Sequence, residues 1–408
     1  MFWYRHYTFM ASSLRRNHFI CKSLGSRVKS FQIQGLALAV VIFAAACREP
    51  FDPNIRPEQT NYLVVEGFIN AQGSTNITLS RTTLPKDTAA THPEQGAAIT
   101  IMGEDNSAFR LSERPAGYYQ SDSVSLNSNQ KYRILIKTSE GKEYLSDYLS
   151  VKKTPPLDSV SWRNENNGVN IYVNSHDEPN NSRYYKWTYN ETWEVHSKWP
   201  VLRGYVNGNV SARDDSEINK MFYCWHSQNS SSIVSGSTAG LSDNIISMVP
   251  IVNIPPDGEQ LSIRYSILVK QVAMDRQTYE FYQVMKKNTE TTGSLFAPLP
   301  TDLSTNIHSV SNPAEKVIGY MSVSTEETKR IFISNSEVPG WNYQSGCVSE
   351  LVENDPSKIT SELPMFVNNG FIPYGTKTTG LTIVGYYAST EFCMDCRTRG
   401  SNVKPDFW

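Results

Sequence analysis

The chain has 408 residues, of which 39% are hydrophobic, and it carries 38 Lys and Arg against 40 Asp and Glu. This apolar content is enough for packed cores, so a largely disordered chain is excluded. The first 46 residues hold six of the basic residues and no acidic one, so the remainder has a formal charge of −8 and no strong Lys/Arg run. That balance argues against nucleic-acid binding, which needs a basic surface.

The first 46 residues predict a secretory signal peptide. Their basic segment leads into LALAVVIFAAAC at residues 36–47. This apolar run is about a dozen residues, whereas a membrane-spanning helix needs roughly 20. The small residues before Cys47 resemble the lipobox of bacterial lipoproteins, although Ala44 stands where Leu or Val is usual. The resemblance implies cleavage before Cys47 and acylation of that residue; an uncleaved anchor or a buried helix is the alternative.

Residues 47–60 are predicted to form a lipidated tether. Several acyl chains give lasting anchorage, because each buried CH2 contributes about 0.8 kcal/mol. The segment REPFDPNIRPEQT at residues 48–60 is polar and contains three prolines, which favours an extended linker over a folded element.

Residues 61–153 predict an N-terminal β-sandwich domain, immunoglobulin-like or transthyretin-like. Short strand-like runs alternate with turn signals every 8–12 residues. In KYRILIKT, Tyr132, Ile134 and Ile136 alternate with polar residues, which suits one buried and one wet face. KKTPP at residues 152–156 marks the boundary, because proline cannot donate to a strand ladder.

Residues 157–408 predict a larger β-rich domain with one helix, at about 275–290. Asp275 provides an N-cap and Gly293 a stop. Tyr279, Tyr282 and Met285 follow at i, i+3 and i+6, which predicts a helix packed on a sheet. An aromatic box that binds a ligand is the alternative interpretation.

The stretch RYYKWTYNETWEVHSKW predicts a long aromatic strand. Its weak candidate binding residues are Tyr185, Trp187, Tyr189 and Trp193. Exposed rings would offer stacking platforms or anchors for a protein partner. Strand alternation places the first three on one face, and that face is the core in the alternative interpretation.

Several stretches together resemble one family, in order along nearly the whole mature chain. They are LVVEGFIN, PAGYYQSD, PPLDSVSW, RYYKWTY, YSILVKQVAMDRQTYEFYQVMKKNTETTGSLF, NIHSVSNPAEKVIGYMSVSTEETKRIFI and CMDCRTRGSNVKPDFW. The chain resembles the Bacteroidota outer-membrane lipoproteins called domain of unknown function 4249. The resemblance implies an outer-membrane location, surface-exposed or periplasm-facing. It also implies a TonB-dependent receptor as partner, because such genes often lie beside those of the family. It implies no activity.

Four cysteines besides Cys47 remain in the mature chain: Cys224, Cys347, Cys393 and Cys396. An even number in an exported protein predicts two disulfides. Bonds from Cys224 and Cys347 to the terminal C-x-x-C pair would close long loops, so they are favoured over a Cys393–Cys396 bond. Redox catalysis and zinc binding are the alternatives. The residues after the pair are not helical, and no second closely spaced ligand pair exists.

The sequence carries no nucleophile or phosphate-binding motif, and its histidines lack metal-ligand spacing. We therefore expect no catalytic residue, metal or cofactor. The hypothesis is a non-catalytic accessory or binding subunit of a TonB-dependent receptor in nutrient uptake. The alternatives are an envelope structural or assembly lipoprotein without a small ligand, and a surface hydrolase acting on glycan or peptide.

Overall fold

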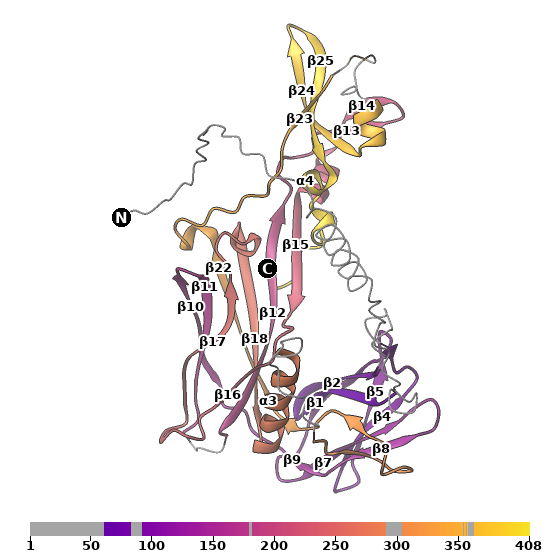
Figure 1. Cartoon of the computed structure of the whole chain (residues 1–408), viewed down its shortest axis with the longest axis vertical. Helices are drawn as coiled ribbons and strands as arrows, with labels where there is room; N and C mark the ends of the chain where they lie inside the picture. Colours follow the sequence, from indigo (N-terminus) through magenta and orange to yellow (C-terminus); the bar gives the residue numbers. More distant parts are fainter. Residues whose placement is uncertain are drawn as a thin grey trace, which may run out of the picture. The chain divides into compact units, whose positions relative to one another are not determined.

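The computed structural model describes residues 61–82, 92–178, 182–290, 304–353, 355, 357 and 363–408. The predicted signal peptide, Cys47 and the tether at 47–60 lie outside these residues. The protein is mainly β with a few helices, as predicted (Figure 1). Within the described part of the chain, no helix is long and apolar enough to cross a membrane.

The strands of the predicted N-terminal sandwich form one continuous, mainly antiparallel sheet. They are β1 (Leu63–Asn70), β2 (Gln72–Arg81), β3 (His92–Pro93), β4 (Ala98–Gly103), β5 (Ala108–Glu113), β6 (Tyr118–Ser125), β7 (Lys131–Lys137), β8 (Glu143–Ser146) and β9 (Leu149–Ser150). The main path runs β8-β7-β4-β5-β6-β2-β1. Alternate residues point inward, so Tyr132, Ile134 and Ile136 share one core with Leu63 and Ile77 from the other end of the sheet.

A later segment returns to complete this sheet, which the sequence does not predict. Strand β19 (Ile307–Ser309) pairs antiparallel with β8, while β20 (Val317–Ile318) and β21 (Val323–Ser324) pair parallel with β1. Ile307, Val317, Met321 and Val323 are buried in the same core as β1 and β2. Part of the predicted C-terminal domain, 157–408, therefore packs with the first domain.

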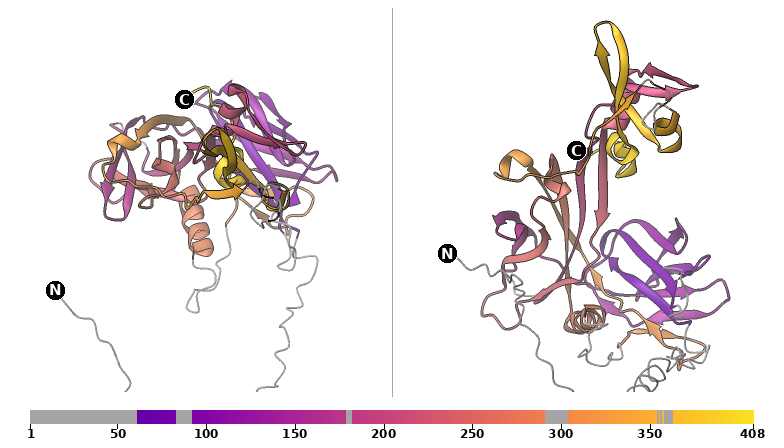
Figure 2. Two further views of the ribbon diagram at one scale, coloured as in Figure 1. Left: turned by 90° about the horizontal axis from the view of Figure 1, so that it is seen from above. Right: turned by 45° about the horizontal axis from the view of Figure 1, so that its top comes forward.

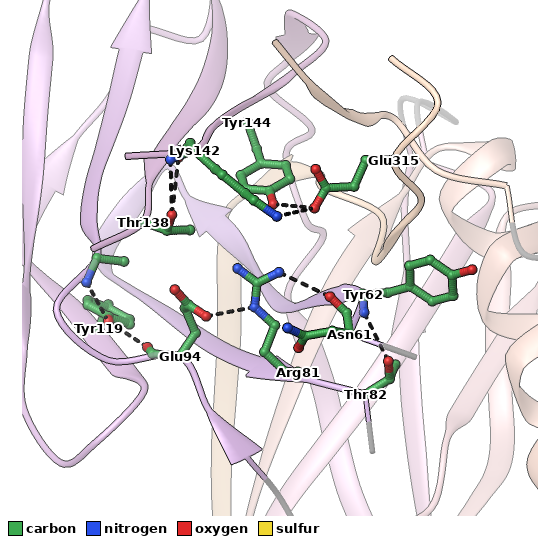
Figure 3. A network of polar contacts seen from close by, with 11 residues as sticks. Asn61, Tyr62, Arg81, Thr82, Glu94, Tyr119, Thr138, Lys142, Tyr144 and Glu315 are labelled. Carbon is green, nitrogen blue, oxygen red and sulfur yellow. Dashed lines mark hydrogen bonds and ion pairs between the residues drawn. The ribbon is translucent and has the colours of Figure 1, made fainter. Parts of the chain in front are cut away.

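A buried polar network holds the start of the sheet (Figure 3). Arg81 Nε lies 2.7 Å from Glu94 Oε2, and the two side chains are only 9% and 11% exposed. Arg81 Nη1 also donates to the Asn61 carbonyl at 3.2 Å. Burial raises the pKa of Tyr144 to about 12, and its hydroxyl donates to Glu315 at 2.7 Å. The network thus ties the entering chain and the returning segment to the sheet.

The second region is a sandwich of two sheets. One contains β10 (Leu157–Glu165), β11 (Gly168–His176) and β17 (Ile245–Ile254). The other contains β12 (Tyr184–His196), β15 (Tyr223–Asn229), β16 (Val234–Ser237), β18 (Arg264–Met274) and β22 (Glu326–Ser334). A single buried cluster joins them, with Ile171 and Val173 on one side and Trp187 and Ile267 on the other.

The predicted helix at 275–290 is confirmed as α3 (Arg276–Glu290). Its N-cap is also as predicted, because Asp275 Oδ1 accepts from the Thr278 N–H at 2.7 Å. Gly293, the predicted stop, lies outside the described residues. Helix α2 (Asp215–Phe222) is additional, and its cap, Asp214, accepts from the Glu217 N–H. Shorter helical segments are η2 (Glu259–Leu261), η3 (Asn335–Glu337), η4 (Leu363–Asn368), α4 (Glu391–Met394) and η5 (Cys396–Thr398).

A small lobe is formed by the later residues and an earlier hairpin. It contains β23 (Glu350–Glu353), β24 (Phe371–Thr379) and β25 (Thr382–Thr390) in one sheet, with β13 (Arg203–Val206) and β14 (Asn209–Ala212) in another. Its core buries Val352, Met365, Phe366, Tyr386 and Ala388, against which Tyr205 and Phe371 pack. Figure 2 shows the β24–β25 hairpin extending beyond the rest of this lobe.

Candidate binding site

The four aromatic residues predicted as weak binding candidates are buried, which corrects that prediction. Tyr185, Trp187, Tyr189 and Trp193 are between 0% and 8% exposed. They belong to the core between the two sheets of the second region. Alternation along β12 does place Tyr185, Trp187 and Tyr189 on one face, but that face packs against the opposing sheet instead of facing solvent.

The polar ends of two of these rings form hydrogen bonds inside the protein, whereas the buried Trp193 Nε1 has no partner among the described residues. Trp187 Nε1 donates to Gln271 Oε1 at 2.7 Å, and the Tyr185 hydroxyl donates to the Ser182 carbonyl at 2.6 Å. Burial raises the pKa of Tyr185 to about 12, which keeps this donor protonated. The aromatic strand therefore fixes the core and offers no stacking platform.

The opposite face of β12 carries the helix α3, as the spacing of Tyr279, Tyr282 and Met285 predicts. The rings of Tyr184 and Tyr279 lie 5.0 Å apart, centroid to centroid. Lys186 Nζ lies 3.9 Å from the centroid of the Tyr282 ring, a cation–π contact. Figure 1 shows α3 between this strand region and β1.

A hollow of about 520 Å³ opens between α3, the outer face of β12 and the edge of the first sheet. This volume lies within the range of small-molecule sites. Its lining comes from five separate segments: Val64, Val65, Glu66 and Gly67; Lys186 and Thr188; Ser230, Ser231, Ser232 and Ile233; Phe281, Tyr282, Met285 and Thr289; and Ile318, Gly319 and Tyr320. Residues 318–320, where the chain returns to β1, thus supply one part of its wall.

The wall of the hollow combines apolar rings with unpaired polar groups. Phe281 is buried beneath it, and its ring lies 5.7 Å from that of Tyr320. Burial raises the pKa of Tyr320, with nearby carboxylates adding to the shift, so its hydroxyl stays a neutral donor. In the described part of the chain, the Tyr282 and Tyr320 hydroxyls have no hydrogen-bond partner, and Lys186 and Glu66 form no ion pair.

This arrangement suits binding. A ligand could meet an apolar floor, two hydroxyl donors, one cation and one carboxylate. Among the described residues, the lining holds one carboxylate, on Glu66, and no histidine. The helical spacing of Tyr282 and Met285 was the one sequence signal for this site. Only the tertiary structure shows that β1 and Tyr320 also line this hollow.

The cysteines pair across the chain, as favoured from the sequence. Cys224 bonds to Cys396 and Cys347 bonds to Cys393, each with a Cα–Cα distance of 5.7 Å. The terminal C-x-x-C pair is thus divided between two partners. One bond ties the last residues to β15, and the other closes the base of the lobe.

No group of three His, Cys, Asp or Glu side chains able to hold a metal ion occurs among the residues with described positions. His176 pairs with Asp158 at 2.8 Å, linking β11 to β10. That hydrogen bond raises the pKa of His176 above its ordinary value. We interpret the contact as a strand-to-strand pair at the surface.

The comparisons with known proteins identify the family. The model of the family described as Domain of unknown function (DUF4249) matches residues 48–330. The chain belongs to this family. A search of curated proteins gives no match. A solved two-domain fibronectin type-III segment from chicken tenascin aligns at 10% identity over 53% of this chain and 91% of that one. Its TM-score of 0.16 is too low to bear on the fold or function.

Proposed function

We propose that this protein is a lipid-anchored outer-membrane protein and a non-catalytic binding subunit of a TonB-dependent receptor in nutrient uptake. The lipid anchor rests on the signal peptide and Cys47. The family match begins at residue 48, immediately after the proposed cleavage and acylation site, which supports this interpretation. The 13 residues from 48 to 60 then reach at most about 45 Å when fully extended.

The observation that carries the binding role is the hollow beside α3. Among the described residues, its Tyr282 and Tyr320 hydroxyls have no hydrogen-bond partner and its Lys186 and Glu66 side chains form no ion pair, and they stand next to apolar walls. Lys186 contacts only the face of the Tyr282 ring there. Polar groups left without protein partners in a partly enclosed site are available to a ligand. The rings of Tyr185, Trp187, Tyr189 and Trp193, in contrast, are buried in the core.

A strain lacking the gene tests the role directly. We expect reduced growth on at least one limiting carbon, nitrogen or iron source, with normal abundance of the outer-membrane receptors by quantitative mass spectrometry. Loss of a receptor from the membrane would favour the assembly factor instead. Normal growth on every source, with unchanged receptors, would contradict both roles.

Substitutions in the hollow then connect the phenotype to the site. Lys186→Ala and Tyr282→Ala should reproduce the growth defect, because they remove a cation and one hydroxyl from the wall. Lys220→Ala is the matched control, since Lys220 is an exposed lysine on α2, outside the hollow. Equal growth of the Lys186→Ala and Lys220→Ala strains would contradict the proposal that the hollow is the binding site.

A further inference from the structure

The parallel ladder between β1 and the returning chain is interrupted where it borders the hollow. Strand β20 pairs with β1 up to Val64, and β21 pairs with β1 again from Ile69. The register is the same on both sides of the interruption, so residues 319–322 run opposite residues 65–68. No ladder pair joins these two segments, which are both described in full. Together they form a ladder gap.

Two glycines shape the ladder gap and turn its backbone toward the hollow. Gly67 has a φ of +130° and Gly319 a φ of +148°, which other residues rarely adopt. A Cβ on Gly319 would clash with the carbonyl oxygen of Val65. Both glycines line the hollow, and because glycine has no side chain they line it with backbone atoms. Glycine within a strand often marks a place where a ligand approaches the backbone closely.

The geometry of the ladder identifies the backbone groups that are left over. The Ile69 N–H donates to the Ser322 carbonyl at 2.9 Å, so Gly67, two residues earlier, directs its N–H to the same edge. In an unbroken ladder the Gly67 N–H would donate to the Tyr320 carbonyl, and the Tyr320 N–H would donate to the Val65 carbonyl. Neither bond forms, and the Gly67 N–H and both backbone groups of Tyr320 have no other partner among the described residues.

The opposite side of the same chain is satisfied by a side-chain amide. The Thr305 hydroxyl donates to the Gly319 carbonyl at 2.8 Å. Asn306, which is buried, donates from Nδ2 to the Met321 carbonyl at 2.9 Å and accepts from the Met321 N–H at 2.8 Å through Oδ1. One carboxamide thus satisfies an N–H and a C=O together. Tyr320 offers the same pair of groups on the side of β1, and buried backbone groups nearly always have a partner. An amide in a ligand would supply it.

The side chains of the hollow define the rest of the ligand. Lys186 and Glu66 bring one cation and one carboxylate, and Phe281 and Met285 bring apolar surface. A short peptide carries the complementary groups, namely a carboxylate, an ammonium group, amides and apolar side chains. A neutral sugar would leave both charges without a partner. The volume of about 520 Å³ suits a small molecule and excludes a folded chain.

We propose that the hollow binds a short peptide with free termini. The peptide amides bond to the backbone of the ladder gap, and the terminal carboxylate pairs with Lys186. Charge-assisted hydrogen bonds of this kind are stronger than neutral ones. This inference rests on the proposed function, because it names the class of ligand for the site proposed there.

The first test separates the amides from the charges. Titration calorimetry compares two probes on the full-length, tagged protein in detergent. One is the tripeptide alanyl-leucyl-alanine, and the other is 8-aminooctanoic acid, which has both charges at a similar separation and no amide. We expect 8-aminooctanoic acid to bind at least about tenfold more weakly, because the backbone groups of the ladder gap then lack a partner. Equal affinities would overturn the role assigned to the ladder gap.

The second test concerns the contact with Lys186. Lys186→Ala should lower the affinity for the free tripeptide by about tenfold and leave the affinity for the same tripeptide with an amidated C-terminus unchanged. Lys220→Ala, on the exposed side of α2, should change neither affinity. An equal loss of affinity for the two probes would contradict the pairing of Lys186 with the carboxylate.

The third test observes the backbone directly, by hydrogen exchange resolved to single residues with mass spectrometry. Saturating tripeptide should slow exchange at the Gly67 and Tyr320 amides at least about tenfold, because these N–H groups gain an acceptor. The amide of Gly380, in the exposed turn between β24 and β25, should exchange at the same rate with and without the tripeptide. Unchanged exchange at Gly67 and Tyr320 in the bound protein would overturn the contact with the ladder gap.

The outcomes separate this inference from the proposed function. Absence of tripeptide binding by the wild type would overturn the peptide as the class of ligand. The proposed function would survive that result if Lys186→Ala and Tyr282→Ala still reproduce the growth defect of the deletion strain. If the two variants also grow normally, the hollow is not the binding site and both proposals for it are wrong.

Discussion

The two disulfides should contribute unequally to stability, and the inequality can be worked out from the structure. Cys224–Cys396 spans 172 residues of sequence, whereas Cys347–Cys393 spans 46. Closing a loop in the unfolded chain removes entropy that grows with the logarithm of its length. That relation gives about 5 kcal/mol for the first bond and about 4 kcal/mol for the second, as upper values. The first bond should therefore stabilise the fold by about 1 kcal/mol more.

The assay compares two double variants, Cys224→Ser with Cys396→Ser and Cys347→Ser with Cys393→Ser, both made in a Cys47→Ser background that prevents acylation. Urea unfolding without reductant gives their stabilities, and intact mass confirms the remaining bond. We expect the first variant to unfold at lower urea. Proteolysis of the second variant should begin within the lobe, because that bond closes its base. A second variant less stable than the first would refute the chain-entropy argument.

Three further perturbations test the interior and one surface pair. Arg81→Met should lower the free energy of unfolding in urea by about 3 kcal/mol, because it leaves Glu94 buried and unpaired. Adding Glu94→Leu to this variant should recover part of the lost stability. No recovery in the double variant would contradict the pairing. Trp187→Ala should lower the free energy of unfolding by about 4 kcal/mol, because the side chain is fully buried. A decrease of less than about 1 kcal/mol would contradict the orientation of β12 that buries Trp187. NMR titration should give His176 a pKa above 6.5, and Asp158→Asn should lower it. The stabilisation from this pair is fully present below pH 6.5 and is lost as the pH rises through the raised pKa; an unchanged pKa in Asp158→Asn would contradict the contact.

Local patterns in the sequence predicted the elements well. The alternation in KYRILIKT identified the inward residues of β7, and Asp275 marked the start of α3. The cysteine count predicted two disulfides, and the lengths of the closed loops favoured the cross-pairing that the structure has. Each of these signals lies within a few residues of what it predicts or follows from general redox chemistry.

Which face of β12 is buried could not be predicted from the sequence pattern. Alternation grouped Tyr185 with Trp187, but the choice of the buried face depends on the opposing strands β10 and β11. Aromatic rings suit a core as well as a binding surface, so their identity could not decide between them. The candidate site consequently lies on the other face, at Lys186.

The return of residues 307–324 was also beyond prediction. Its strands are only two or three residues long, and they pair with segments that lie far away in the sequence. The β24 strand was also beyond prediction, because Pro373 and Gly375 interrupt its pattern. Helix α2 had a readable cap at Asp214, but its eight residues are too few for a clear helical period.

The most direct test of the central claim is to purify the tagged, full-length protein from its native outer membrane in mild detergent and identify what accompanies it by mass spectrometry. The account predicts one TonB-dependent receptor in a stoichiometric amount. Recovery of the wild-type protein alone, under conditions that preserve other complexes of that membrane, would contradict it.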